Sequence, residues 1–190
     1  MFHANEYVKA ESLEQAYELN QKRSNVLAGG MMWLKMSSGN RNTVIDLSGL
    51  GLDQIEETED EFRIGCMCSL RQLELHKGLN QYFDGAFREC TRWIVGTQFR
   101  NSATVGGSVF GRFGFSDILT CMMVLDSYVE LYKGGTVSLE EFAKMKYSRD
   151  ILVRIIIKKD GRKAAYASQR RSKTDFPLIA VAAAKKDDMW

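Results

Sequence analysis

The sequence has no long hydrophobic run and almost no net charge, and each absence excludes a class of protein. No segment approaches the roughly eighteen apolar residues that a membrane span requires, and the N-terminus carries charges where a signal peptide needs an apolar core. A net charge of +2 is too small for a nucleic-acid-binding surface. We therefore expect a cytoplasmic protein without membrane or nucleic-acid partners.

Candidate metal ligands are also scarce. The chain contains two histidines and four cysteines, Cys66, Cys68, Cys90 and Cys121. Only Cys66 and Cys68 are close in sequence, and neither a CxxC pair nor a neighbouring histidine accompanies them. We expect buried, reduced thiols rather than metal ligands, and no side chain stands out as a catalytic acid, base or nucleophile.

The composition that remains is that of a folded globular protein. Apolar residues make up 45% and charged residues 26% of the chain, which excludes global disorder. The length of 190 residues fits one large domain or two small domains that share an interface.

Residues 1–50 predict a small α/β unit. Ser12 begins a capped helix, residues 25–28 form a short strand that ends at Gly29-Gly30, residues 31–36 form a second helix, and residues 43–47 form another strand. Strands that are joined through a helix are expected to pair in parallel.

After Gly49 the pattern changes to antiparallel strands with short helices between them. Alternating or β-branched runs predict strands, and serines or acidic residues before apolar stripes predict helix starts. The expected strands are 54–58, 61–65, 128–132, 136–137, 151–157, 164–168 and 177–184; the expected helices follow Ser69, cover 81–93, and follow Ser116 or Asp117 and Ser138. Residues 94–117 hold a glycine-rich segment.

Two glycine segments are candidates for ligand binding through their backbone. The first follows a predicted strand at Gly29-Gly30 and precedes a predicted helix. Glycines before a helix start offer free N–H groups to a pyrophosphate. The second surrounds Gly106-Gly107 and precedes Ser116 and Asp117, whose side chains suit hydrogen bonds to ligand hydroxyls. A simple turn and a structural loop remain the alternatives for the first and second segment respectively.

The order of motifs adds a family resemblance. The segments VLAGG, VIDLSGL, FRIGCMCSLRQLE, FRNSATVGGSV and SDILTCMMVLD together resemble the FAD-binding domain of the molybdenum hydroxylases, a family that includes xanthine dehydrogenase and the medium subunit of carbon monoxide dehydrogenase. The resemblance implies an α+β fold of the PCMH/vanillyl-alcohol-oxidase type, with a small parallel α/β lobe (1–50) and a larger lobe with an antiparallel sheet (51–158). Residues 159–190 resemble the start of the family's C-terminal domain, so the chain is expected to be a short variant or to share its flavin site with another chain.

The resemblance also implies which residues contact FAD. Carried over by motif, they are Ala28, Gly29, Gly30, Met31, Met32, Thr104, Val105, Gly106, Gly107, Ser108, Ser116 and Asp117. Met31 and Met32 replace polar residues of the family, and Ser108 replaces an Asn or Asp, so side-chain bonds to the pyrophosphate are lost at the methionines. Arg100 is expected either to fix the second segment or to touch FAD. The residues Phe110, Arg112, Phe113 and Phe115 are expected either to stack on the flavin or to fill the pocket.

The function implied by the resemblance is that of an FAD-dependent oxidoreductase subunit. Electrons would pass from the iron–sulfur centres of a small subunit through FAD to NAD+ or another acceptor, and a large subunit would carry molybdopterin. The alternatives are a non-catalytic scaffold that has lost FAD, and a stand-alone flavoprotein reductase.

Overall fold

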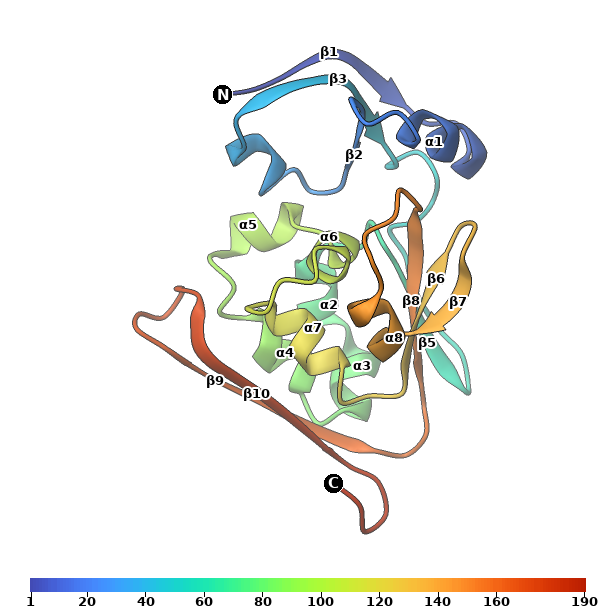
Figure 1. Ribbon diagram of the computed structural model, residues 1–190. Helices are drawn as coiled ribbons and strands as arrows, with labels where there is room; N and C mark the ends of the chain where they lie inside the picture. Colours follow the sequence, from blue (N-terminus) through green and yellow to red (C-terminus); the bar gives the residue numbers. More distant parts are fainter.

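The computed structural model describes residues 1–190 and contains a parallel sheet, an antiparallel sheet and a long hairpin (Figure 1). The parallel sheet lies at the top of the view in Figure 1, and helices α5 and α6 lie below it. The hairpin crosses the opposite side of the molecule. None of the helices is long and apolar enough to cross a lipid bilayer.

The N-terminal sheet has the strand order β1-β3-β2 and is parallel throughout, as predicted. Its strands are β1 (Phe2–Lys9), β2 (Val26–Ala28) and β3 (Gly39–Asp46), and α1 (Leu13–Asn20) begins after the Ser12 cap. The sequence does not predict β1, because most of this edge strand is exposed and carries no apolar alternation.

The helix expected at residues 31–36 is wrong. Only a single 3-10 turn, η1 (Leu34–Met36), forms there, and Met31 has a φ of 61°. A residue with a side chain in the left-handed region cannot continue a right-handed helix. The chain therefore leaves β2 as an open loop.

The second sheet is antiparallel, as predicted, with the order β4-β5-β8-β6-β7. Its strands are β4 (Ile55–Glu57), β5 (Glu61–Gly65), β6 (Ser127–Leu131), β7 (Gly135–Ser138) and β8 (Leu152–Lys158). Helix α8 (Leu139–Lys144) follows β7, and the predicted capping box between Ser138 and Glu141 is present.

Short helices cover this sheet. They are α2 (Leu70–Leu75), α3 (Lys77–Tyr82), α4 (Ala86–Thr91), α5 (Thr97–Ser102), α6 (Val105–Phe110) and α7 (Asp117–Met122). The single helix expected at 81–93 is interrupted because Asp84 and Gly85 take positive φ angles. The glycine-rich segment 94–117 contains α5 and α6, so the loop expected around Gly106-Gly107 is helical instead.

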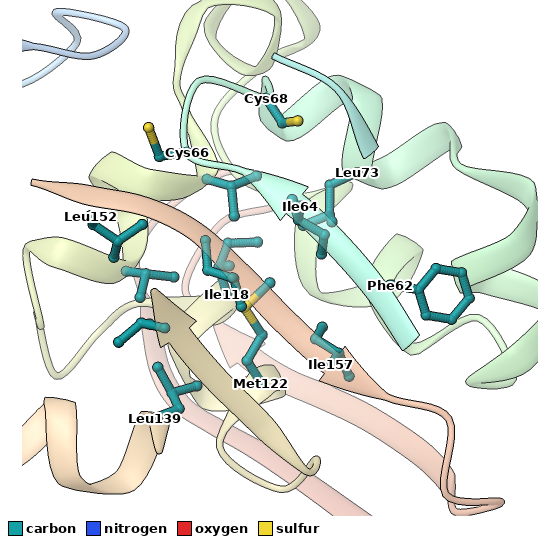
Figure 2. Packing of buried hydrophobic residues seen from close by; sticks show 14 of the residues in the cluster. Phe62, Ile64, Cys66, Cys68, Leu73, Ile118, Met122, Leu139, Leu152 and Ile157 are labelled. Carbon is teal, nitrogen blue, oxygen red and sulfur yellow. The ribbon is translucent and has the colours of Figure 1, made fainter. Parts of the chain in front are cut away.

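The core lies between the antiparallel sheet and the helices (Figure 2). Phe62 and Ile64 of β5 and Ile157 of β8 lie on the sheet side, and Ile118 and Met122 of α7 lie on the helix side; all are buried. All four cysteines are free and buried, as predicted. Burial raises the pKa of both Cys66 and Cys68 to about 12, so these thiols stay protonated at neutral pH.

The C-terminal strands form an antiparallel hairpin, as predicted, from β9 (Lys163–Arg170) and β10 (Pro177–Lys185). Strand β9 packs on α4, and β10 packs on α7. The hairpin therefore belongs to the same contiguous core as the antiparallel sheet, through Ala164 and Tyr166. The division of the chain into domains at residues 50 and 158 stays a prediction.

We predict that Gly106→Ala destabilises the fold. A Cβ atom at this position would lie 2.6 Å from both the Cβ and the carbonyl oxygen of Cys66, so α6 has to move away from the end of β5. Overpacking of this kind costs about 1–3 kcal/mol, which urea unfolding would measure. Gly107→Ala is the matched control, because its Cβ would meet only Thr104 Oγ1, at 3.1 Å; equal losses in both variants would contradict the prediction.

Candidate cofactor site

The two glycine segments lie against each other in the fold. A Cβ atom on Gly30 would lie 1.8 Å from the carbonyl oxygen of Ser102, and one on Gly29 would lie 2.7 Å from Thr104 Oγ1. The loop after β2 therefore touches the backbone between α5 and α6 directly. Glycine is required at position 30 by this contact between chain segments, and not only by the approach of a ligand.

The first glycine segment carries a row of free hydrogen-bond donors. The backbone N–H groups of residues 29–34 have no acceptor in the protein backbone, because β2 has ended and no helix has begun. The same residues line a cavity of about 530 Å³. Successive free N–H groups in a concave loop favour a bound anion.

The N–H groups at the second glycine segment are already used. Those of Val105 and Gly106 donate to the carbonyl oxygens of Cys68 and Cys66, at 2.8 and 2.9 Å, and that of Gly107 donates to Thr104 Oγ1 at 3.2 Å. The helix start predicted at Gly29-Gly30 is therefore wrong, because the helix starts after Thr104 in the second segment. The free N–H groups lie in the first segment, at residues 29–34.

Most of the predicted site residues meet at the cavity. The first segment contributes Gly29, Gly30, Met31 and Met32, and the second contributes Thr104, Gly107 and Ser108, with Ser116 and Asp117 beside them. Three predicted residues do not line it: Ala28, Val105 and Gly106.

Two of those three face an adjoining cavity, and the third lies in the core. Val105 is fully buried, whereas Ala28 and Gly106 line a second cavity of about 430 Å³ together with Arg23 and Arg41. Both cavities share Leu27, Gly29, Thr104 and Gly107 in their walls. The junction between the glycine segments therefore borders an apolar compartment on one side and a basic compartment on the other.

Ser116 and Asp117 bind the protein's own groups. The Ser116 hydroxyl donates to the carbonyl oxygen of Ser108 at 3.0 Å and accepts from the N–H of Leu119. The Asp117 carboxylate accepts from the Tyr166 hydroxyl and the Arg170 guanidinium of β9. Burial raises the pKa of Asp117, although both partners lower it. Asp117 thus fixes the hairpin to the cavity wall, and the contact of Ser116 and Asp117 with FAD stays a prediction.

Arg100 fixes the second segment and does not line the cavity. Its Nε donates to Glu74 Oε2 at 2.7 Å, and its Nη1 donates to the carbonyl oxygen of Ile94 at 3.2 Å. Both charged side chains are buried. Arg100 was expected either to fix the second segment or to touch FAD, and its contacts in the structure are those of the first role.

The residues at the end of α6 and in the loop after it lie in two different places. Phe113 and Phe115 line the cavity, whereas the Arg112 guanidinium lies over the rings of Phe142 and Tyr147, at 4.1 and 4.6 Å from their centroids. Phe110 packs against the same two rings. Phe113 and Phe115 therefore remain candidates for ligand contact.

Trp33 and Phe176 also line the cavity, although the sequence does not predict them as site residues. Trp33 lies in the segment 31–36, where the predicted helix does not form, and Phe176 lies in the distant hairpin between β9 and β10. A local pattern carries no signal that brings these rings together, because only the tertiary fold does so.

Comparison with known proteins gives one family and several relatives. Residues 2–159 match the family described as "FAD binding domain in molybdopterin dehydrogenase". The chain is 26% identical over 186 residues to the uncharacterized protein YgfM of Escherichia coli (strain K12), covering 96% of this chain and 70% of YgfM. It is also 26% identical over 131 residues to the 6-hydroxypseudooxynicotine dehydrogenase complex subunit alpha of Paenarthrobacter nicotinovorans, covering 65% of this chain and 44% of that one.

Solved structures share the fold. A chain of carbon monoxide dehydrogenase from Hydrogenophaga pseudoflava superposes with a TM-score of 0.85 at 21% identity, over 96% of this chain and 69% of that one. A chain of quinoline 2-oxidoreductase from Pseudomonas putida 86 gives a TM-score of 0.83 at 17% identity, over 96% of this chain and 67% of that one. The PCMH-type α+β fold implied by the sequence resemblance is therefore confirmed.

We predict that the Arg100–Glu74 pair stabilises the second glycine segment in a pH-dependent way. Glu74→Gln leaves a buried guanidinium without its main counter-charge, which costs about 3–5 kcal/mol at neutral pH. Burial raises the pKa of Glu74, but Arg100 and Arg71 lower it further, so the folded-state pKa lies below its usual value. The stabilisation is present above the unfolded pKa and is lost as pH falls through the folded one, below about pH 4.

Urea unfolding at neutral and acidic pH measures this effect. The gap in unfolding free energy between wild type and Glu74→Gln should narrow as the pH falls. Glu140→Gln is the control, because it removes one side of an exposed ion pair with Lys144 and should change little. A gap that stays constant with pH would show that the loss at Glu74 has nothing to do with its charge.

Proposed function

This chain belongs to the family of FAD binding domains in molybdopterin dehydrogenase, and on this premise we propose that it is the FAD-binding subunit of a molybdenum hydroxylase-type complex. The observation that carries the proposal is the row of free N–H groups at residues 29–34 in the cavity wall. FAD contains a pyrophosphate, and backbone N–H groups are suitable donors for its oxygens. Met31 and Met32 do not weaken this binding mode, because it uses no side chain at those positions.

The rest of the cavity also fits a dinucleotide. Gly29 and Gly107 leave open the junction between the two compartments, where a side chain would narrow it. The apolar compartment suits a large aromatic ring, and Arg23 and Arg41 of the basic compartment add positive charge that suits the central pyrophosphate. We assign the contacts with FAD to Gly29, Gly30, Met31, Met32, Thr104, Gly107, Ser108, Ser116 and Asp117, and we assign Ala28, Val105 and Gly106 a supporting role.

The protein needs no acid, base or nucleophile of its own for this function. FAD supplies the redox chemistry when it is bound, and the protein supplies binding, orientation and electrostatic environment. The chain's residues bind the pyrophosphate and enclose the ring, and the Asp117–Arg170 pair holds the hairpin against the cavity. A site built mainly from backbone groups and aromatic side chains is suited to binding and orienting FAD, while FAD supplies the redox chemistry.

Partner subunits follow from the same proposal. The relative in Paenarthrobacter nicotinovorans is a subunit of a dehydrogenase complex. We propose that an iron–sulfur subunit delivers electrons to this chain, that a molybdopterin subunit oxidises the substrate, and that NAD+ or another acceptor takes the electrons from FAD in the cytoplasm. A scaffold that has lost FAD and a self-sufficient flavoprotein reductase are the competing functions.

We predict that the purified protein binds FAD and that Gly107→Val abolishes binding. A valine at position 107 projects into the junction of the two compartments, whereas the existing glycine leaves space there. The visible absorption spectrum after gel filtration, with and without added FAD, measures the bound flavin. Gly96→Ala is the control, because a Cβ at Gly96 has no neighbour within 4 Å and the residue lies outside the cavity wall.

Each result separates the competing functions. Retention of flavin by wild type and Gly96→Ala but not by Gly107→Val supports the proposal. A folded wild-type protein that takes up no FAD would support the scaffold instead. A flavin-loaded protein that reduces acceptors with a soluble electron donor, and associates with no iron–sulfur protein, would support the self-sufficient reductase.

A further inference from the structure

One arginine in the wall of the basic compartment joins the turn between α1 and β2 to the antiparallel sheet. Arg149 lies shortly before β8, and in Figure 1 this segment rises from β8 toward α1. Its guanidinium donates to the backbone carbonyl oxygens of Asn20, Lys22 and Asn25, the last two at 2.9 and 2.8 Å. The carbonyl oxygen of Arg149 accepts from the side-chain amide of Asn20 at 2.7 Å. The two segments are therefore bonded to each other in both directions.

Both sides of this contact are fixed. The residue after Arg149 is Asp150, whose carboxylate accepts from the backbone N–H groups of Lys133 and Gly134 after β6, at 3.1 and 2.8 Å. On the other side, Asn20 and Asn25 are only 6% and 3% exposed. Hydrogen bonds that are shielded from water and belong to a satisfied network hold their segments in one arrangement. The contact thus determines where the turn after α1 lies relative to the sheet.

The guanidinium of Arg149 has no carboxylate partner. No ion pair in the structure includes Arg149, so backbone carbonyl groups and the Asn20 side chain meet its charge. Helix α1 ends at Asn20, and carbonyl groups at a helix C-terminus attract a cation. The planar fork of arginine bonds several such oxygens at once, which the single ammonium group of lysine does less well.

The turn that Arg149 holds also carries Arg23. Residues 22–25 form this turn, and the Arg23 side chain lines the basic compartment together with Arg41. Neither Arg23 nor Arg41 forms an ion pair, so both charges are available to a ligand. Strand β2 begins at Val26, directly after the turn, and leads into the first glycine segment. The place of Arg23 beside that segment therefore depends on the contact with Arg149.

We propose that Arg149 is a positioning residue for the cofactor, which holds Arg23 where its charge supports pyrophosphate binding by the first glycine segment. The inference rests on the proposed function and adds how the chain keeps the basic compartment in its binding arrangement. Arg149 acts through the turn, because its guanidinium is bonded to the carbonyl oxygens of that turn. Without these bonds the carbonyl groups need other partners, and the turn shifts toward water together with Arg23.

Titrations of the full chain with FAD test this role in a double-mutant cycle. Arg149→Lys keeps the positive charge but loses the planar fork, and it should weaken FAD binding about tenfold, the effect of losing one charge-assisted hydrogen bond. Arg23→Gln should weaken binding by a similar factor. Because Arg149 acts through Arg23, adding Arg149→Lys to Arg23→Gln should cause little further loss.

The salt dependence of FAD binding gives a readout that a purely structural role would not change. Salt screens the attraction between Arg23 and a phosphate group. Arg149→Lys should therefore reduce the salt dependence to the level of Arg23→Gln, although it removes no charge. Arg162→Lys is the matched control, since Arg162 also donates to a backbone carbonyl oxygen, that of Val124 at 2.8 Å, and lines neither compartment. It should change neither the affinity nor its salt dependence.

A second variant makes the same comparison without altering Arg149. Asn20→Ala removes the two bonds between the Asn20 side chain and Arg149. It should cause a smaller loss of FAD affinity, and this loss should also disappear when Arg23→Gln is present. Circular dichroism checks that each variant is folded before its affinity is compared with that of wild type.

The other possible outcomes contradict the role in distinct ways. Wild-type FAD affinity in folded Arg149→Lys and Asn20→Ala would overturn the positioning role and leave the proposed function intact. Losses that add fully in the double variants would show that Arg149 acts independently of Arg23, which also overturns it. A folded wild-type protein that binds no FAD would overturn the proposed function and the positioning role together.

Discussion

The site depends on one backbone contact, between Gly30 and the turn at Ser102 and Ala103. Any side chain at position 30 would overlap the Ser102 carbonyl group, so the parallel sheet can approach the helical layer only with glycine there. This approach places the first glycine segment beside Thr104 and Gly107. The two compartments and their shared junction exist because the two segments are this close.

The backbone path after β2 explains why the N–H groups of residues 29–34 stay free. After β2 ends at Ala28, the chain turns with a positive φ at Met31 and does not reach even a 3-10 turn until Leu34. Backbone N–H groups that have no protein partner are unfavourable unless water or a ligand satisfies them. A loop of this shape lowers the stability of the fold. An anion that accepts hydrogen bonds from these N–H groups offsets part of this loss when it binds.

The strands and caps could be predicted from the sequence because their signals are local. β-branched runs predicted β8, and serines before apolar stripes predicted the starts of α1, α7 and α8. The segment around Gly106 was expected to be a ligand-binding or a structural loop. It forms α6, whose start is capped by the Thr104 side chain. Glycine is needed at position 106 because α6 packs closely on Cys66 and leaves no room for a side chain, and this tertiary effect has no local signal.

The order of motifs predicted which segments meet at the site but not what each side chain does there. Arg100, Ser116 and Asp117 are polar residues next to a glycine-rich segment, and such residues are natural candidates for ligand contact. In the fold, each one satisfies a protein group first: Arg100 binds Glu74, Ser116 binds the carbonyl group of Ser108, and Asp117 binds Tyr166 and Arg170. Buried polar groups must find partners whether or not a ligand is present.

It follows that the protein divides its polar groups into two sets. Arg100 pairs with Glu74 and Arg170 pairs with Asp117, and these two pairs hold the second glycine segment and the hairpin in place. The free backbone donors of residues 29–34 and the exposed aromatic rings are left for a ligand. A site arranged in this way recognises a dinucleotide by shape, by backbone hydrogen bonds and by stacking, so polar side chains after Gly30 can be replaced by Met31 and Met32 without removing the groups that bind.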